Sequence, residues 1–546
     1  MPSSTSSNEH PPEPARLQEV EKTRPAFVLT WTEVKLLGIA GVGFFLDAYD
    51  LFIINPVATM LQYRLYGGAS LPANLEGFMK AGANIGSVIG QFLFGYLADS
   101  LGRKAVYGKE LMLIIIATIL CLTTPTGSLS PDSCLIYLGM FRILLGVGVG
   151  GDYPMSASVT SDRANLRKRG TMLAYIFSNQ GWGSLVGSLV TIIVLECYRH
   201  VMHDEGKTSK VDGVWRIVVG LSLIPAFGTL YQRLTMPESK RFEASKNLDE
   251  EKNVMQLKQA NERTEGLRGY NGSPNESSTF NGTKESKEPT VVSVGGVAFD
   301  ANENPEAIAT KKEKAHIGEF LRYFSEWRHL KLLIGTSMCW FLLDIAFYGI
   351  NLNQNVVLQQ IGFDGKSGSP WEKLINVSTG GIIITALGFV PGYYASILTI
   401  EILGRKVIQI QGFLMAALFL GILAGKFNSL SHASFIVCFT LLQFFFNFGA
   451  NTTTYCYPAE LFPTRFRAFA HGISAASGKA GAIISALAFN QLSKDVGTPV
   501  VLWIFFGVCI LGAVFTLLLP EVKGRDPDLV FAEEIRDARV KAGLKA

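Results

Sequence analysis

The chain has 546 residues, of which 48% are hydrophobic and 17% are charged, whereas a soluble domain carries about 25% charged residues. The net charge of +4 is small and the basic residues stand in short loops, which argues against a nucleic-acid-binding surface. No set of nucleophile, base and orienting residue stands outside the apolar segments, so a soluble enzyme is not expected.

The apolar residues gather in twelve windows, each long enough to cross about 30 Å of hydrocarbon as a helix. The sequence therefore predicts an all-α membrane protein with twelve transmembrane helices. No cleavable signal peptide is expected, because the first window is itself long enough to span the membrane. The windows lie near residues 36–57, 79–98, 107–125, 133–157, 171–195, 215–234, 330–354, 376–400, 407–425, 433–457, 470–491 and 500–519.

A polar segment divides the windows into two sets of six. Residues 243–315 are rich in Glu, Lys, Asn, Ser and Gly without apolar periodicity, which predicts a flexible linker. Its sequons at Asn271, Asn275 and Asn281 are expected to remain unused, because glycosylation needs a lumenal position. We predict a disordered tail over 1–30, a six-helix half over 31–242, a linker over 243–325, a second six-helix half over 326–525 and a tail over 526–546.

Basic residues indicate the side of the membrane that each loop faces. The loops after the second, fourth, eighth and tenth windows carry basic clusters, whereas the loop after the third window carries none. By the positive-inside rule we expect these four loops, the linker and both termini to face the cytosol. The seven cysteines show no metal-ligand spacing, so no metal site is predicted.

The first window contains Asp47 and Asp50, one turn apart on one helical face. Two carboxylates on one face inside a membrane repel each other and lose hydration, which favours the protonated form of at least one of them. Both are therefore candidate proton carriers. The alternative is that one of them packs against a polar partner for structural reasons.

The fourth window ends in GVGVGGDYP, residues 146–154. Its glycines remove side chains, so that another helix or a ligand can approach the backbone closely. Asp152 is an acid at membrane depth and so a functional candidate. Arg142 precedes it by ten residues and is expected to be its partner, since a buried acid is less costly beside a guanidinium.

The chain contains an internal repeat. An acid followed by GRK occurs in both halves, as GYLADSLGRK at 95–104 and LTIEILGRK at 398–406, and a second acid-to-arginine pair recurs seven residues apart. Such repeats are typical of transporters whose substrate binds between two halves. The corresponding residues are Asp99, Arg103, Asp162 and Arg169 in the first half and Glu401, Arg405, Glu460 and Arg467 in the second.

This doubled loop resembles the signature of the major facilitator superfamily. The resemblance implies that these eight charged residues form cytosolic salt bridges that hold the inner side closed, which is a gating role rather than substrate contact. TMPESKRF at 235–242 resembles the motif that ends the first half in sugar-porter-like members, and PEVKGR at 520–525 stands in the equivalent place of the second half.

Polar residues also interrupt the apolar windows of the second half. Trp340, Asp344 and Tyr348 recur every four residues and so line one helical face. An ionised carboxylate there repels an anion, so either the substrate is cationic or Asp344 is protonated when the substrate binds. Asn451 falls where Asp152 or Tyr153 lies in the first half.

Two further side chains could bind an anion. Lys479, ten residues into the eleventh window, is the fixed cation that could hold an anion or neutralise an acid; the alternative is that it reaches to the membrane interface. Gln180, in the fifth window, could donate to an oxyanion or join two helices as an amide contact.

Taken together, several segments resemble the fungal and plant proton-coupled inorganic phosphate symporters over residues 36–525. The resemblance implies a plasma-membrane importer of phosphate driven by the proton gradient, without a cofactor and without nucleic-acid partners. It implies proton movement on Asp47, Asp50 and Asp152 with Arg142 as partner, and a phosphate site of Tyr153, Gln180, Trp340, Asp344, Tyr348 and Asn451 with Lys479 close by. The segments are GFFLDAYDLF at 43–52, GGDYP at 150–154, SNQGWG at 178–183, WFLLDIAFYG at 340–349 and residues 447–479.

Two alternatives remain open from the sequence. A symporter of a glycerophosphodiester or another organic anion would use the same donors, because it carries the same phosphate oxygens. A phosphate sensor that signals through its tail and linker would also bind phosphate.

Overall fold

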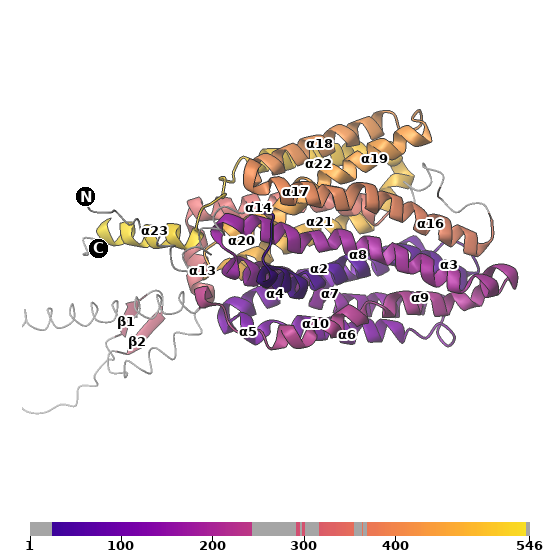
Figure 1. Cartoon of the computed structure of the whole chain (residues 1–546), viewed down its shortest axis with the longest axis horizontal. Helices are drawn as coiled ribbons and strands as arrows, with labels where there is room; N and C mark the ends of the chain where they lie inside the picture. The colour runs from indigo at the N-terminus through magenta and orange to yellow at the C-terminus, as the bar shows by residue number, and fades with distance from the viewer. Residues whose placement is uncertain are drawn as a thin grey trace, which may run out of the picture.

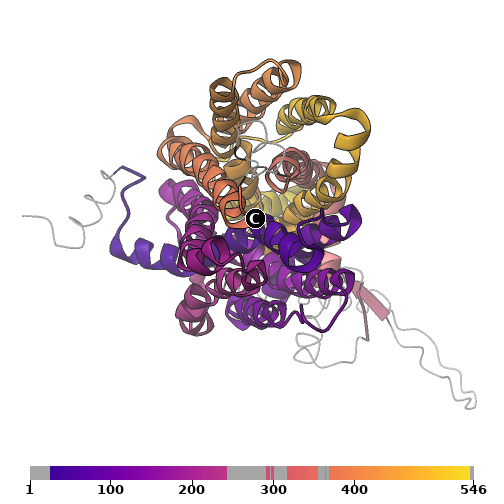
Figure 2. The ribbon, with the colours of Figure 1, turned by 90° about the vertical axis from the view of Figure 1, so that its right-hand side faces the viewer.

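The computed structural model describes residues 25–242, 291–294, 297–300, 316–353, 363 and 368–541. Long helices run side by side in an elongated bundle (Figure 1). Seen from one end, the first half and the second half form two adjacent groups of helices (Figure 2). The helices α13 (His316–Ser325) and α23 (Pro527–Lys541) lie together beyond one end of the bundle (Figure 1).

The helices of the first half follow the predicted windows closely. Their ends carry ordinary capping chemistry: Thr30 and Glu33 form a capping box at the start of the first helix, and Ser130 caps the fourth-window helix before a proline. The elements are α2 (Trp31–Phe52), α3 (Ile54–Tyr66), α4 (Ala73–Leu101), α5 (Arg103–Val106), α6 (Lys109–Leu122), α7 (Pro131–Arg163), α8 (Arg169–Cys197), α9 (Val211–Gly220) and α10 (Leu223–Leu234), with short turns of helix at Leu166–Lys168, His200–Asp204 and Thr208–Lys210.

The second half repeats this arrangement. A capping box of Ser369 and Glu372 starts one of its helices, and a π-helical turn, η4 (Thr385–Phe389), interrupts the same span. The elements are α14 (Trp327–Asn351), α16 (Pro370–Ile384), α17 (Val390–Leu403), α18 (Arg405–Gly425), α19 (His432–Asn447), α20 (Ala450–Leu461), α21 (Arg467–Val496) and α22 (Thr498–Thr516).

Eleven segments of the described chain are long and apolar enough to cross a membrane. The predicted window at 79–98 is not among them, although it forms α4, a helix of 29 residues. The reason is that α4 packs along α7 and α21 and so faces protein, which lets it carry buried Lys80, Asn84 and Gln91. With α4 as the twelfth, the helices match the predicted count.

The segment predicted as a linker contains some regular structure. The strands β1 (Val291–Val294) and β2 (Val297–Asp300) pair antiparallel, and α13 follows before the second half begins. The rest of the linker, including the three sequons, lies outside the described residues, as does the tail up to residue 24.

The repeat glycines make the same turn in both halves. Gly102 and Gly404 have φ angles of 100° and 85°, which favour glycine. After each turn the backbone N–H of the lysine donates to a glutamate from the end of the same half: Lys104 to Glu238 at 3.1 Å and Lys406 to Glu521 at 3.0 Å. The two glutamates belong to PESKR and PEVKGR, so the predicted correspondence between the halves extends to three dimensions.

The glycine run of α7 allows a close contact with α4. A Cβ atom on Gly146 or Gly150 would overlap the backbone of Ala83 or Ser87. On the other side of the contact, a Cβ on Gly86 would overlap the backbone of α7. The expectation that these glycines let another helix approach is confirmed, and this contact fixes α7 in the middle of the first half.

Buried aromatic side chains fill the space between the halves. Phe44, Tyr153 and Phe177 of the first half pack with Trp340 and Tyr455 of the second in one apolar cluster. Phe177 stacks on Tyr455 with ring centroids 4.6 Å apart. The polar site described below is therefore surrounded by buried aromatic side chains of both halves.

We expect Gly146→Ala to destabilise the protein by about 1–3 kcal/mol, because the new methyl group must displace the α4 backbone. Gly228→Ala in α10 is the matched control, since nothing lies within 4 Å of its Cβ position and alanine favours the helix. Thermal unfolding of the detergent-solubilised protein measures both changes. Equal midpoints for the two variants would contradict the close contact.

Candidate functional site

Three polar side chains of the first half meet at the centre of the bundle. The Tyr153 hydroxyl donates to Asp47 Oδ2 at 2.5 Å, and Gln180 Nε2 donates to the same oxygen at 3.2 Å. Gln180 Nε2 also donates to the Tyr153 hydroxyl at 2.7 Å. All three side chains are buried. Asp47, predicted as a proton carrier, thus lies among the residues predicted to bind the anion.

Lys479 on α21 joins this group from the second half. Its ammonium donates to the Tyr348 hydroxyl at 2.6 Å and to the Tyr153 hydroxyl at 3.3 Å. It also lies over both rings, 4.5 Å and 5.0 Å from their centroids. Lys479 is buried, so the alternative that it reaches to the membrane interface is wrong.

A chain of hydrogen bonds continues from Gln180 into the second half. The Tyr393 hydroxyl donates to Gln180 Oε1 at 3.2 Å, and Asn451 Nδ2 donates to the Tyr393 hydroxyl at 2.9 Å. Asn451 also contacts Asn447 at 2.7 Å. Sequence reasoning missed Tyr393, a phenol of α17 within an apolar window; its position after Pro391 and Gly392 was the available signal.

Trp340 and Asp344 lie on α14, two turns and one turn before Tyr348 respectively. The rings of Trp340 and Tyr153 are 6.1 Å apart. Asp344 is 2% exposed, and its Oδ2 has no hydrogen-bond partner within the described residues, while Lys479 and Asp47 lie within electrostatic range. We call Asp47 and the seven predicted anion-site residues, together with Tyr393, the central cluster.

Asp50 and Arg142 form a separate group. Arg142 donates to the backbone carbonyl oxygens of Asp50 at 3.2 Å and Met79 at 3.0 Å. A cavity of about 20 Å³ lies between them, lined also by Thr118 and Trp215. That volume suits about one water molecule. Asp50 and Asp47 therefore have different partners, although they are one turn apart.

Asp152 pairs with Arg233 of α10, and the expectation that Arg142 is its partner is wrong. Ten residues along α7 separate Arg142 from Asp152 by about 15 Å and place them on different faces. Arg233 also pairs with Glu110 at 3.3 Å and donates to the Ile39 carbonyl oxygen at 3.1 Å. Sequence reasoning missed Arg233 and Glu110, because charges near the ends of apolar windows are usually topology signals.

The predicted gating residues cluster at the end of the bundle that carries α13 and α23, which we call the charged end. In the first half, Arg103 pairs with Asp99 at 3.1 Å and with Asp162 at 3.4 Å. Asp162 in turn pairs with Arg467 of the second half. All four side chains are buried, so removal of one partner of the Asp162–Arg467 pair between the halves would leave an uncompensated buried charge.

The equivalent residues of the second half do not repeat the pairing between the halves. Arg405 pairs with Glu401 at 2.9 Å and with Glu460 at 2.6 Å. Arg169, the counterpart of Arg467, is 1% exposed, but its guanidinium makes no hydrogen bond within the described residues. Glu460 lies within its electrostatic range.

Two carboxylates also bind helix N-termini of the opposite half. Asp99 accepts hydrogen bonds from the backbone N–H groups of Ala468 at 3.3 Å and Phe469 at 2.8 Å, at the start of α21. Glu401 accepts from Thr171 N–H at 3.1 Å, at the start of α8. Helix N-termini carry a partial positive charge that favours a carboxylate. Each half therefore stabilises the N-terminus of one helix in the other half.

The C-terminal helix α23 adds to this closure. Asp528 accepts from the Thr464 N–H at 2.6 Å and from its hydroxyl at 2.7 Å, and lies 3.7 Å from Arg467. Burial opposes ionisation of Asp528, but the Arg467 charge and the Thr464 hydrogen bonds outweigh it, so the pKa of Asp528 lies below its usual value. The ionised Asp528 is therefore stable at neutral pH.

The opposite end of the bundle also has contacts between the halves. Asn55 donates to the Asn351 carbonyl oxygen at 3.0 Å and Lys80 to that of Leu352 at 3.1 Å. Trp371 donates to the Leu195 carbonyl oxygen at 2.7 Å. Contacts at both ends thus enclose the central cluster.

Two repeated halves around a buried polar cluster, joined by charged loops, define a transporter of the major facilitator type. The chain belongs to the sugar (and other) transporter family, whose model matches residues 36–530. This is a family of membrane transporters rather than enzymes.

Similar proteins agree with this class. The chain is 37% identical to the inorganic phosphate transporter PHO84 of Saccharomyces cerevisiae, over 90% of this chain and 83% of that protein. It is 44% identical to a Schizosaccharomyces pombe protein provisionally named an inorganic phosphate transporter, over 95% of this chain and 91% of that protein. The proton:xylose symporter XylE, solved with 6-bromo-6-deoxy-D-glucose, is similar in fold, with 20% identity, a TM-score of 0.64 and 92% of this chain and 98% of that chain covered. The predicted fold class is confirmed.

We expect Arg467→Gln to open the charged end, because it removes one partner of a buried ion pair between the halves. The loss of about 3 kcal/mol shifts the ratio of closed to open forms about 100-fold. Spin labels at cysteines replacing Leu101 and Leu403, in a background without Cys197, report the distance between the halves.

Arg465→Gln is the matched control, because it removes an arginine of the same segment that pairs with Glu319 of α13. A distance distribution in Arg467→Gln that matches the control would rule out this role of the pair.

Proposed function

We propose that this protein is a proton-coupled symporter that imports inorganic phosphate by alternating access, with phosphate bound in the central cluster. The names of its relatives support phosphate as the substrate. The cluster supports the same substrate, because hydroxyl, amide and ammonium groups donate hydrogen bonds and suit phosphate oxygens.

One observation carries the coupling: Tyr153 and Gln180 both donate to the Asp47 carboxylate. Carboxylate oxygens and phosphate oxygens accept from the same donors, so ionised Asp47 competes with phosphate for them. A proton on Asp47 removes its charge and weakens both bonds. The Tyr153 hydroxyl and the Gln180 amide then become free to hold the anion.

Charge balance in the cluster favours proton uptake with the substrate. Asp47 and Asp344 oppose the single charge of Lys479, and dihydrogen phosphate adds another negative charge. With both acids ionised, two negative charges would remain uncompensated in a buried site, which is costly. With both acids protonated, Lys479 neutralises the phosphate, and the Asp344 hydroxyl can donate to it.

Asp50 and Asp152 extend the proton pathway away from the substrate. Each acid has an arginine beside it, Arg142 and Arg233 respectively, and each keeps a buried carboxylate oxygen without a hydrogen-bond partner within the described residues. A carboxylate in that environment can take up a proton at modest cost. We assign both acids to proton movement. The positive charge of the neighbouring arginine favours the ionised carboxylate and so promotes release of the proton.

We place the protein in the plasma membrane with the charged end and both termini in the cytosol. The basic loops support this orientation. The structure has contacts between the halves at both ends, so it corresponds to an occluded step of the transport cycle. Release of phosphate inward then requires the salt bridges of the charged end to separate, and the proton gradient supplies the driving force without a cofactor.

Uptake of labelled phosphate into proteoliposomes tests the proposal. We expect accumulation only when an inward proton gradient is imposed, with competition by unlabelled phosphate and none by sulfate. Stronger competition by glycerophosphoinositol would favour the organic-anion alternative. Uptake that did not depend on the pH gradient would contradict the proposed proton coupling.

We expect Asp47→Asn to separate phosphate binding from proton coupling. An amide cannot hold the proton and lacks the negative charge that competes with the anion, so exchange of phosphate persists and becomes less dependent on pH. Accumulation driven by the gradient falls at least tenfold. Counterflow and gradient-driven uptake, measured on the same proteoliposomes, distinguish these results from a simple loss of folding.

We expect Lys479→Gln to weaken phosphate binding about 10–100-fold, because it removes a charged hydrogen-bond donor from a buried site. Lys494→Gln, an exposed lysine of the same helix, is the control and should bind phosphate like the parent protein. Equilibrium binding of labelled phosphate to purified protein gives both constants. Unchanged affinity in Lys479→Gln would remove this lysine from the site.

A further inference from the structure

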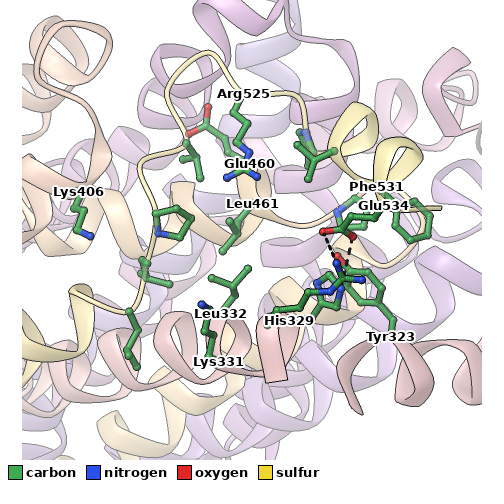
Figure 3. Close-up of a pocket in the computed structure, with 18 of the residues that line it drawn as sticks. Tyr323, His329, Lys331, Leu332, Lys406, Glu460, Leu461, Arg525, Phe531 and Glu534 are labelled. Atoms are coloured by element: carbon green, nitrogen blue, oxygen red, sulfur yellow. Dashed lines mark ion pairs between the residues drawn. The ribbon is translucent and has the colours of Figure 1, made fainter. Parts of the chain in front are cut away.

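A second cavity lies at the charged end of the second half, far from the central cluster. It has a volume of about 400 Å³, between the starts of α14 and α18, the end of α22 and the segment that leads into α23. Figure 3 shows its walls, with Lys406, Arg525 and Lys331 coming from three different elements around it. Neither the repeat nor the transport mechanism above gives this cavity a function.

The cavity wall has an excess of positive charge. Arg328 and His329 lie near Glu534, at 3.7 Å and 3.6 Å. Glu460 is held by Arg405 at 2.6 Å. Lys331, Lys406 and Arg525 have no ion pair with any carboxylate of the described residues. Lys331 and Lys406 therefore line the cavity without an ion pair, and Arg525 adds a third positive charge within electrostatic range of Glu534.

The rim of the cavity is apolar and exposed. Leu517 and Leu518 at the end of α22 line it, with exposed fractions of 63% and 40%. Val407 and Trp327 do not line the cavity but follow Lys406 and precede Arg328, which do, and they are 53% and 67% exposed. Exposed apolar side chains at the ends of spanning helices face lipid, and tryptophan marks the level of the headgroups. The cavity thus opens where headgroups and acyl chains meet.

We propose that this cavity binds the phosphorylated headgroup of an anionic membrane lipid. Basic pockets between transmembrane helices accept phosphoinositide-type headgroups, and a cavity of this volume holds a ligand of that size. A soluble inositol phosphate offers the same phosphate chemistry, but it would leave the apolar rim uncovered. The rim therefore favours a lipid over the soluble headgroup.

Occupancy of this cavity would act on the charged end. The helix α23 contributes Val530, Phe531 and Glu534 to the wall and Asp528 to the closure at Thr464 and Arg467. A headgroup between the cavity wall and α23 holds that helix in place. The lipid thereby stabilises the closed form of the charged end. That the lipid belongs to the cytosolic leaflet rests on the orientation in the proposed function.

Thermal unfolding of the full chain in detergent tests the proposal, independently of transport and orientation. Short-chain phosphatidylinositol bisphosphate is compared with short-chain phosphatidylcholine and with soluble inositol trisphosphate. We expect only the phosphoinositide to raise the midpoint, by about 5 °C at saturation. The triple variant Lys331→Gln, Lys406→Gln, Arg525→Gln should bind it on the order of 100-fold more weakly.

The matched control removes three exposed charges from the first half, as Lys104→Gln, Lys109→Gln, Lys240→Gln, and should bind like the parent chain. If the cavity triple variant is unstable without lipid, Lys331→Gln alone should weaken binding about fivefold. An equal rise of the unfolding midpoint with inositol trisphosphate would contradict the proposal that the ligand is a lipid. Equal binding by the two triple variants, or no shift in the parent chain, would overturn the site.

Discussion

The cost of burying charge inside a membrane determines where the ionisable side chains of this protein lie. The Arg233 guanidinium is buried, and its charge is compensated by Asp152 and Glu110. It also donates hydrogen bonds to backbone carbonyl oxygens of α2. Among the described residues, Lys479 has no carboxylate in hydrogen-bond contact and is held by two phenols, while Asp47 and Asp344 lie within electrostatic range. In the proposed function, protonation of these two acids leaves the Lys479 charge for the substrate anion.

The central cluster divides its charges between the halves. The first half supplies Asp47 with the donors Tyr153 and Gln180, and the second half supplies Lys479, Asp344 and the amide of Asn451. Neither half alone supplies all the residues of the proposed phosphate site. A substrate held this way must lose contacts with one half when the bundle opens at either end, so binding and closure are linked energetically.

Much of the fold and most of the site could be predicted from the sequence, because polar residues inside apolar windows are few and conspicuous. The repeat also located the ion pairs of the charged end, because the spacing from acid to arginine occurs once in each half. Tyr393 and Arg233 were not predicted, because their contacts depend on which helices pack against each other in three dimensions. Spacing along α7 suggested Arg142 for Asp152. The pairing depends instead on the packing of α10 against α2 and α6, which brings Arg233 to Asp152, and sequence spacing carries no information about that packing.

The two halves match in sequence but not in pairing at the charged end. Arg467 forms an ion pair with Asp162 of the opposite half. Glu460, the counterpart of Asp162, pairs instead with Arg405 of its own half, and the Arg169 guanidinium makes no hydrogen bond within the described residues. The ion-pair attraction between the halves therefore lies mainly on the Arg467 side, where Asp528 of α23 also binds. On the other side, the Thr171 N–H donates to Glu401 of the opposite half, and Arg169 lies within electrostatic range of Glu460. The two sides of the charged end therefore differ in the kind of contact that must be lost before the halves separate.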